Sequence, residues 1–221
     1  MGKVKDELHL EPGIISIIGG GGKTTFLKSI SKELFGHKVL TTSTHFFPFD
    51  DIFTSDFTSK EQLAKALEAH PRLVAAQDIG EKKLIEPSLS MDEIAEVATW
   101  VLVEADGSRH LPFKAHADHE PPIPENSNLV VQIIGAPGFG KTVAQSVHRP
   151  AIFCEIAGCT ENDIVTPELL SKVLNAEDLC DCIIINQAED PSFEDIAKRL
   201  QACVDYPVYW GSIRDSNIHK A

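Results

Sequence analysis

The sequence predicts an α/β fold with a mostly parallel sheet and helices on both faces of it. Short apolar runs alternate with amphipathic stretches from one end of the chain to the other, which is typical of such folds. No internal repeat or low-complexity linker interrupts this alternation. The length of 221 residues favours a single domain over residues 1–221. The content of 43% hydrophobic and 24% charged residues is that of an ordinary globular protein.

The first third of the chain predicts a strand, a helix and a second strand. Ile14 to Ile18 form an apolar run of strand length. Phe26, Ile30 and Leu34 then recur at helical spacing, so they share one helix face. A glycine at position 36 suits the positive φ that ends many helices. The predicted elements are a strand over 14–18, a helix over 24–35 and a strand over 38–42.

Capping signals place the later helices. Ser59 with Gln62, and Ser90 with Glu93, have the spacing of a capping box. Thr166 followed by proline is a typical helix start. The segment 106–128 lacks periodicity, and loops of that length usually serve a function. The predicted helices begin at 59, 90, 166 and 192, and the predicted strands span 73–76, 100–104, 129–134, 182–185 and 207–210.

The charge balance excludes some classes of partner. There are 20 basic and 33 acidic residues, a net charge of -13, which argues against binding to nucleic acid or to an anionic membrane. No segment approaches the roughly 18 apolar residues that span a bilayer. Residues 1–11 are charged and lack the apolar core of a signal peptide. With five cysteines, an odd number, we expect reduced thiols and a cytoplasmic location.

Two Gly-Lys-Thr sites compete for the role of a phosphate-binding loop. Residues 135–142 match G-x-x-x-x-G-K-S/T letter for letter, whereas the first site has Ile17 where the leading glycine belongs. A phosphate loop also needs a buried strand before it and a helix after it. The first site has both, whereas Pro137 and Pro150 disturb the second. We therefore predict that ATP or GTP binds at Gly19, Gly20, Gly21, Gly22, Lys23, Thr24 and Thr25.

Acidic and hydroxyl side chains follow two of the predicted strands. A phosphate-loop enzyme needs a carboxylate at the end of a neighbouring strand to hold Mg²⁺. We expect Thr24 to bind Mg²⁺ together with Glu104 or Asp106, and the sequence leaves open which of the two acids it is. A hydroxyl from the Thr-rich run 41–44 is expected to complete the metal shell or touch the terminal phosphate. His45 is expected to orient a water or the substrate.

Cations in the long loop predict a second binding function. Arg109 and Lys114 are expected to clamp an anionic substrate or the transferring phosphoryl group. Lys23, His45 and Arg109 are thus the predicted catalytic residues. Asn186 ends an apolar run in a pattern that is faintly similar to the N-K-x-D element of GTPases, and we predict that it contacts the base. This pattern does not decide between ATP and GTP.

The order of these segments resembles the YqeC family of accessory proteins for selenium-dependent molybdenum hydroxylases. The resemblance covers roughly residues 13–210 and implies a P-loop nucleotide-binding fold, a three-layer sandwich. It also implies a role in maturing a molybdenum enzyme, by insertion of selenium or of the molybdenum cofactor, so the expected partner is a molybdenum hydroxylase or its cofactor. It places residues 138–150 in a variable loop. The matching segments are 15–19, 22–25, 41–45, 103–109, 114–115, 119–121 and 147–150.

We therefore predict a Mg²⁺-dependent P-loop NTP-binding protein, an ATPase or GTPase, that assists maturation of such an enzyme. Two alternatives stay open. The shortened loop resembles the Mur-ligase-like branch of P-loop enzymes, which favours a small-molecule kinase or an acyl-phosphate-forming ligase. Because His45 is the one evident candidate for a general base, a nucleotide-gated binding module with negligible turnover is the other.

Overall fold

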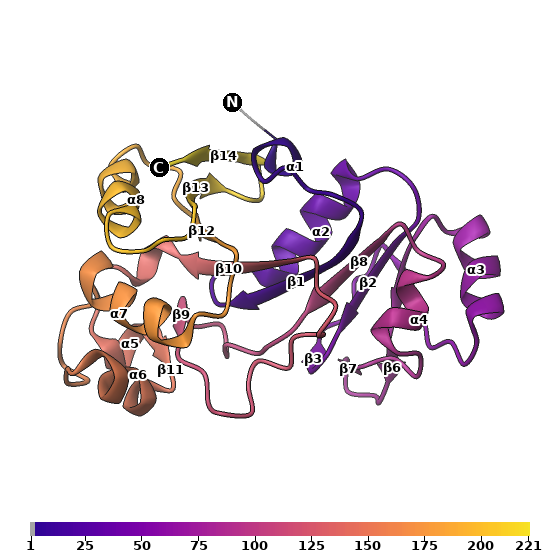
Figure 1. The fold of residues 1–221 in the computed structure, drawn as a ribbon. Helices are drawn as coiled ribbons and strands as arrows, with labels where there is room; N and C mark the ends of the chain where they lie inside the picture. Colours follow the sequence, from indigo (N-terminus) through magenta and orange to yellow (C-terminus); the bar gives the residue numbers. More distant parts are fainter. Residues whose placement is uncertain (1–2) are drawn as a thin grey trace.

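A nine-stranded sheet runs through the protein in the computed structural model, which describes residues 3–221 (Figure 1). All neighbouring strands of this sheet are parallel except the last pair, β13 and β14. The mostly parallel sheet predicted from the sequence is thus confirmed. In spatial order the strands are β14 (Asn217–Lys220), β13 (Val208–Ser212), β12 (Cys182–Asn186), β10 (Leu129–Gly135), β1 (Gly13–Gly19), β8 (Trp100–Glu104), β2 (Lys38–Thr42), β5 (Arg72–Ala75) and β4 (Phe53–Ser55).

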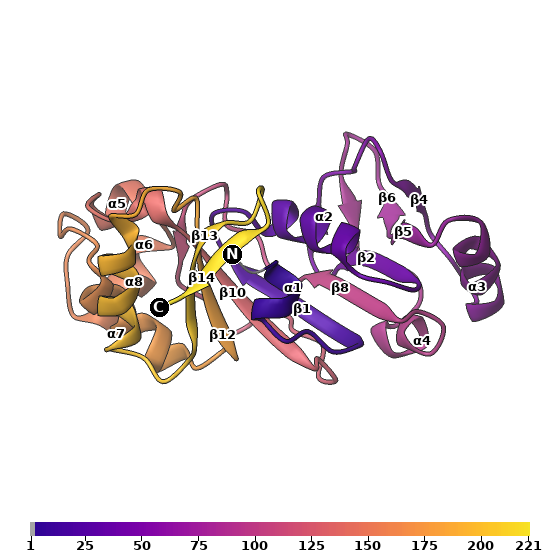
Figure 2. The ribbon, with the colours of Figure 1, turned by 90° about the horizontal axis from the view of Figure 1, so that it is seen from above.

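Helices cover both faces of the sheet. Successive side chains of a strand point to opposite faces, so Ile15 and Ile17 of β1 pack in one apolar cluster and Ile14 and Ile18 in the other. The first cluster includes α1 (Val4–Glu7) and α2 (Lys23–Glu33). The helices of the second cluster lie at the two ends of the sheet, as Figure 2 shows. These helices are α3 (Lys60–Ala69), α4 (Met91–Ala95), α5 (Val143–Ser146), α6 (Pro150–Ala157), α7 (Pro167–Glu177) and α8 (Phe193–Gln201).

The predicted caps are present. The Ser59 hydroxyl accepts a hydrogen bond from the N–H of Gln62, and Ser90 forms the full capping box with Glu93. The first long helix ends at Glu33, two residues before the predicted end, because the chain turns into extended backbone at the next residue. All nine strands and helices predicted after residue 59 exist within a few residues of their predicted bounds.

The elements that the sequence did not predict are mostly too short to show periodicity. They include α1, β4, β14, the short helix η1 (Ala136–Gly138) and two small sheets. One unpredicted element is longer: α6 begins at Pro150, where proline occupies the first helical position and does not end a helix. The small sheets are formed by β3 (His45–Phe46), β7 (Leu84–Ile85) and β6 (Gln77–Asp78), and by β9 (Phe113–Lys114) with β11 (Val147–His148).

The topology brings the predicted site residues to one edge of the sheet. β1 lies between β8 and β10, and the chain crosses from β8 to β10 through residues 105–128. The ends of these strands are in register, with Ile17 beside Glu104 and Gly19 beside Ile133. Ligands in open α/β sheets bind outside the carboxyl ends of the strands, where the strand order reverses. Within residues 3–221, no helix is long and apolar enough to cross a membrane.

Candidate nucleotide-binding site

The glycine-rich loop leaves β1 and enters α2 directly. Gly21 and Gly22 have φ values of 79° and 135°, which favour glycine. A Cβ at Gly21 would lie 2.5 Å from the Cα of Gly135, so the backbones of the two loops are in contact there. No side chain caps α2 at Gly22, and the N–H groups of residues 21–25 have no acceptor among the residues described. Such free N–H groups at a helix start form a favourable place for an anion.

The loop forms one wall of a cleft with a volume of about 1110 Å³. Five other parts of the chain supply the remaining walls, so the cleft joins segments that are far apart in the sequence. Its surface mixes cations, hydroxyls, two carboxylates, three imidazole rings and two phenyl rings. The lining residues are Gly21, Gly22, Lys23, Thr24, Thr25, Thr44, His45, Phe46, Phe47, Glu104, Gly107, Ser108, Arg109, His110, Glu120, His148, Arg149 and Gln187.

Lys23 is a buried cation at the inner end of this cleft. Only 5% of the residue is exposed. Its Nζ donates to the carbonyl oxygen of Gly19 over 2.5 Å and lies 3.1 Å from Oδ1 of Asp106. The side chain therefore folds back over its own loop, beside the free N–H groups, where it can meet a phosphate oxygen.

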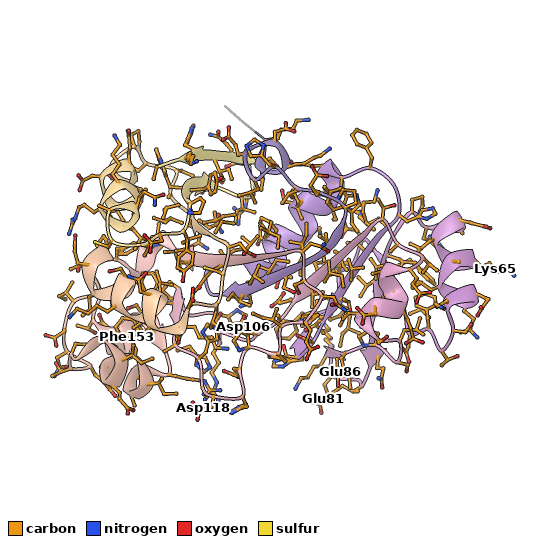
Figure 3. The ribbon with its side chains drawn as sticks, viewed as in Figure 1. Lys65, Glu81, Glu86, Asp106, Asp118 and Phe153 are labelled. Carbon is orange, nitrogen blue, oxygen red and sulfur yellow. The ribbon has the colours of Figure 1, made fainter. Side chains whose placement is uncertain are left out.

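Asp106 is the centre of a buried charge network and does not line the cleft. Its Oδ2 accepts from the N–H of Gly19 over 3.0 Å and lies 3.3 Å from Nζ of Lys114 and 3.0 Å from Nε2 of His116. Burial acts to raise the pKa of this carboxyl, but Lys23, His116 and Lys114 outweigh it and hold the pKa well below its usual value. Figure 3 labels Asp106 inside the molecule. Its predicted role as a metal ligand is therefore corrected, because its carboxylate is enclosed by protein partners.

The network extends from Asp106 to helix α7. Glu177, the last residue of α7, accepts from the backbone N–H of His116 over 2.7 Å, and its other oxygen lies 2.8 Å from Nδ1 of the same ring. Burial acts to lower the pKa of His116, but the hydrogen bonds to Asp106 and Glu177 outweigh it and raise the pKa. The sequence analysis assigned no role to Glu177, since it lies 71 residues from Asp106 and carries no motif.

Glu104 is the acid that faces the cleft. Its Oε2 accepts from the hydroxyl of Thr24 over 2.9 Å. Burial raises its pKa to about 7, against the opposing effects of Lys23 and Thr24. The residues described contain no group of three or more His, Cys, Asp or Glu side chains that could hold a metal ion. A hydroxyl and one carboxylate nevertheless suit Mg²⁺, because this ion keeps waters and takes oxygens from a bound phosphate. Of the two acids that the sequence left open, Glu104 is the one that lines the cleft, and its role as a metal ligand stays a prediction.

Some residues at the hydroxyl-rich end of β2 bond to neighbouring strands, and others line the cleft. Thr41 donates to the carbonyl oxygen of Ala75 and Thr42 to that of Glu104, so both hydroxyls link strands and do not reach the cleft. Of the run 41–44, these two hydroxyls are therefore not available to a metal or a phosphate, and the expectation for the run as a whole stays a prediction. Thr44 and His45 do line the cleft. Burial, followed by Lys83 and Lys23, lowers the pKa of His45.

The two predicted cations of the long loop lie in different places. Arg109 is exposed and lines the cleft. Lys114 is fully buried between Asp106 and Glu120, whose Oε2 lies 3.1 Å from its Nζ, so its predicted contact with an anionic substrate is wrong. Arg149, a cation to which the sequence analysis gave no role, lines the cleft instead of Lys114 and lies 2.9 Å from Oε1 of Glu120.

Asn186 is hydrogen-bonded to the glycine-rich loop. Its Nδ2 donates to the carbonyl oxygen of Gly21 over 2.8 Å, and its Oδ1 accepts from the N–H of Ile213 over 2.9 Å. Both polar atoms thus have protein partners that tie Asn186 to the loop, and its predicted contact with the base stays a prediction. The adjacent Gln187 lines the cleft.

The second Gly-Lys-Thr site does not form a comparable cradle. The helix after it, α5, has four residues, and Lys141 is exposed. Backbone N–H groups of this segment already have acceptors, such as that of Val143 on Asp163 and that of Gly140 on Val165. The preference for the first site therefore agrees with the geometry.

Two comparisons with known proteins bear on this site. The family model of the YqeC protein matches residues 15–151, a range that contains the loop, both acids and both cleft arginines. A protein of Escherichia coli (strain K12) named YqeC is 32% identical over 164 residues, which is 67% of this chain and 62% of that protein. The chain thus spans less than two thirds of the length of that relative.

Proposed function

This chain belongs to the YqeC family, and we propose that it is a P-loop NTP-binding protein that binds ATP or GTP with Mg²⁺ and hydrolyses it. The observation that carries the proposal is that Lys23 and the hydrogen-bonded pair Thr24–Glu104 line the same cleft at the uncapped start of α2. This arrangement offers a cation, free N–H groups and oxygen ligands at one end of the cleft.

The residues present fit a nucleotide with its metal. The N–H groups of residues 21–25 would hold the phosphates, and Lys23 would neutralise the terminal ones. Thr24 and Glu104 would hold Mg²⁺ or its waters, and the ion would supply positive charge next to the phosphates. A second cavity of about 330 Å³ shares Thr24 and Thr25 with the cleft, and the nucleoside would lie there, beside α2.

Hydrolysis needs a group that positions water next to the terminal phosphate. His45 lines the cleft, and because its pKa is lowered, its imidazole is neutral at pH 7. A neutral imidazole can accept a hydrogen bond or a proton from water. Arg109 lies on the same cleft and can stabilise charge that develops on the phosphoryl oxygens.

The resemblance to the family extends the proposal to a partner. We propose that nucleotide turnover assists maturation of a selenium-dependent molybdenum hydroxylase, with the enzyme or its cofactor as the partner. This idea is tested by copurification of a tagged chain with the hydroxylase, with MgATP present and absent. Capture that does not change with nucleotide, or between wild type and Lys23→Ala, would contradict it.

A second candidate function is transfer of a phosphoryl group to a small molecule. The volume of about 1110 Å³ favours it, because the cleft continues beyond the phosphate loop to Arg109 and Arg149. A kinase or acyl-phosphate-forming ligase would show nucleotide turnover that depends on a small acid or alcohol. Turnover of MgATP by the isolated chain without any acceptor favours hydrolysis instead.

Calorimetry with MgATP and MgGTP tests the proposed site. Loss of the Lys23 cation from a buried phosphate contact should cost about 2–4 kcal/mol, at least tenfold in affinity. Lys141→Ala is the matched control, since it removes the exposed lysine of the other Gly-Lys-Thr site. We expect Lys23→Ala to lose binding and Lys141→Ala to keep it. The reverse result, or no binding by wild type, would overturn the proposal.

A further inference from the structure

A second group of basic residues lines the cleft away from the phosphate loop. Arg109 and His110 come from the long loop between β8 and β10, and His148 and Arg149 come from the junction of β11 and α6. Phe47, next to β3, completes this end of the cleft. Three segments that are far apart in the sequence thus place basic and aromatic side chains on one surface.

Positive charge exceeds negative charge at this end of the cleft. Arg149 pairs with Glu120, a carboxylate that it shares with the buried Lys114, and Lys114 pairs with Asp106 as well. Arg109 forms no ion pair with the residues that the structure describes. The Nε of Arg149 is buried, and no hydrogen-bond acceptor for it exists in the described part of the chain. Burial first, and then the charges of Lys114, Arg149 and Arg109, lower the pKa of His148, which indicates how closely these cations gather.

The backbone at these cations is held in an unfavourable conformation. The φ values are 51° at Arg109, 63° at His110 and 67° at Arg149. Side chains with a Cβ rarely adopt this region, and residues held there cluster at functional sites and ligand clamps. Arg149 also precedes a proline, which further restricts its backbone. The fold therefore maintains strain at the very residues that present charge to the cleft.

An aromatic wall accompanies the charge. The ring of Phe47 is 58% exposed. It lies nearly parallel to the ring of His110, with 14° between the planes and 6.4 Å between the centroids. Flat rings of this kind stack on planar ligands.

We propose that Arg109, His148 and Arg149 bind the anionic group of a small planar molecule, which stacks on Phe47 and His110 as a second ligand beside the nucleotide. Its role as the second substrate rests on the proposed function, whereas the anion site itself does not. The smaller cavity beside Thr24 and Thr25 leaves this end free when the nucleoside lies along α2. The chemistry fits a phosphate ester or a carboxylate on an aromatic or heterocyclic ring.

Binding of 1-naphthyl phosphate, followed by its fluorescence with saturating MgADP present, tests the site. We expect at least tenfold weaker binding by Arg109→Ala and by Arg149→Ala, and a change below twofold for Arg199→Ala, an exposed arginine of α8 that lines neither cavity. Uncharged 1-naphthol and ring-free inorganic phosphate should each bind at least tenfold more weakly than the ester. Comparison with 1-naphthoate tells whether the site prefers a phosphate or a carboxylate.

Two further variants keep the result decisive. Thermal unfolding reveals whether Arg149→Ala disturbs folding by losing the ion pair with Glu120. Arg149→Lys retains a cation at this position and should bind the probe better than Arg149→Ala. Lys23→Ala should keep the probe while losing ATP. If wild type binds the probe through the arginines but no nucleotide, the anion site stands and the proposed function fails. Displacement of the probe by ATP, its loss in Lys23→Ala, or no binding at 5 mM probe would overturn the inference.

Discussion

Asp106→Asn tests the buried charge network by removing one charge and almost no volume. The asparagine oxygen can still accept from the N–H of Gly19, but Lys23, Lys114 and His116 lose their shared counter-ion. Removing one member of a buried ion pair costs about 3–5 kcal/mol. For a chain of this length that lowers Tm by roughly 6–20 °C. The expected loss is thus far larger than that of a surface substitution.

Urea unfolding followed by tryptophan fluorescence measures this loss. Asp118→Asn is the matched control, because Asp118 lies in the same loop but at the surface (Figure 3). The pKa of Asp106 is depressed, so its stabilisation is present above the ordinary value of 3.8 and is lost as the pH falls through the lower folded value. The variant should lack this acid-labile part. A loss below about 1 kcal/mol at pH 7 would refute the argument that the network is held by Asp106.

Three further predictions concern the same site. Because the pKa of Glu104 is raised to about 7, its contribution to stability is present below the ordinary value of 4.5 and is lost as the pH rises through 7. Glu104→Gln should therefore be more stable than wild type at pH 8, by roughly 2–3 kcal/mol in urea unfolding, while calorimetry shows weaker MgATP binding. Gly21→Ala should destabilise more than Gly140→Ala in thermal unfolding, because both glycines have φ near 80° but a Cβ at Gly140 meets nothing within 4 Å. The raised pKa of His116 predicts a titration midpoint above 6.5 in wild type, measured by NMR, and a lower midpoint in Glu177→Gln. The stability that this histidine contributes is present below pH 6.5 and is lost as the pH rises through the wild-type midpoint.

Much of the sheet could be predicted because its signals are local. An apolar run such as 100–104 is buried along its whole length, so hydrophobicity alone identifies the strand. The caps at Ser59 and Ser90 likewise act within four residues. The edge strand β14 and the two-residue strands have no such signal. They pair because the sheet or a neighbouring loop offers them hydrogen bonds, which is a property of the tertiary fold.

The site was predicted only as far as strand ends reveal it. Parallel strands bring the ends of β1, β8 and β2 to one edge, so Lys23, Thr24 and Glu104 could be grouped before the structure was known. The direction in which each side chain points could not be predicted in this way. Two acids separated by one residue look equivalent in the sequence and would share a face if the strand continued. Because β8 ends at Glu104, the chain after it follows another path: Glu104 lines the cleft, whereas Asp106 lies in the interior. Charge alone likewise did not reveal that Lys114 is buried.

In the function proposed above, the network around Asp106 would let the buried Lys23 exchange one anion for another. A phosphate that binds Lys23 must compete with the carboxylate of Asp106 and the carbonyl oxygen of Gly19. If Lys23 were the sole partner of Asp106, its departure would leave a buried charge without a counter-ion. Lys114 and His116 remain on the other oxygen and keep that charge paired. The cost of moving Lys23 to a phosphate would therefore be limited to the contacts of Lys23 itself. The carboxylate of Asp106 can hold the loop in shape through the N–H of Gly19 and can release Lys23 when an anion binds.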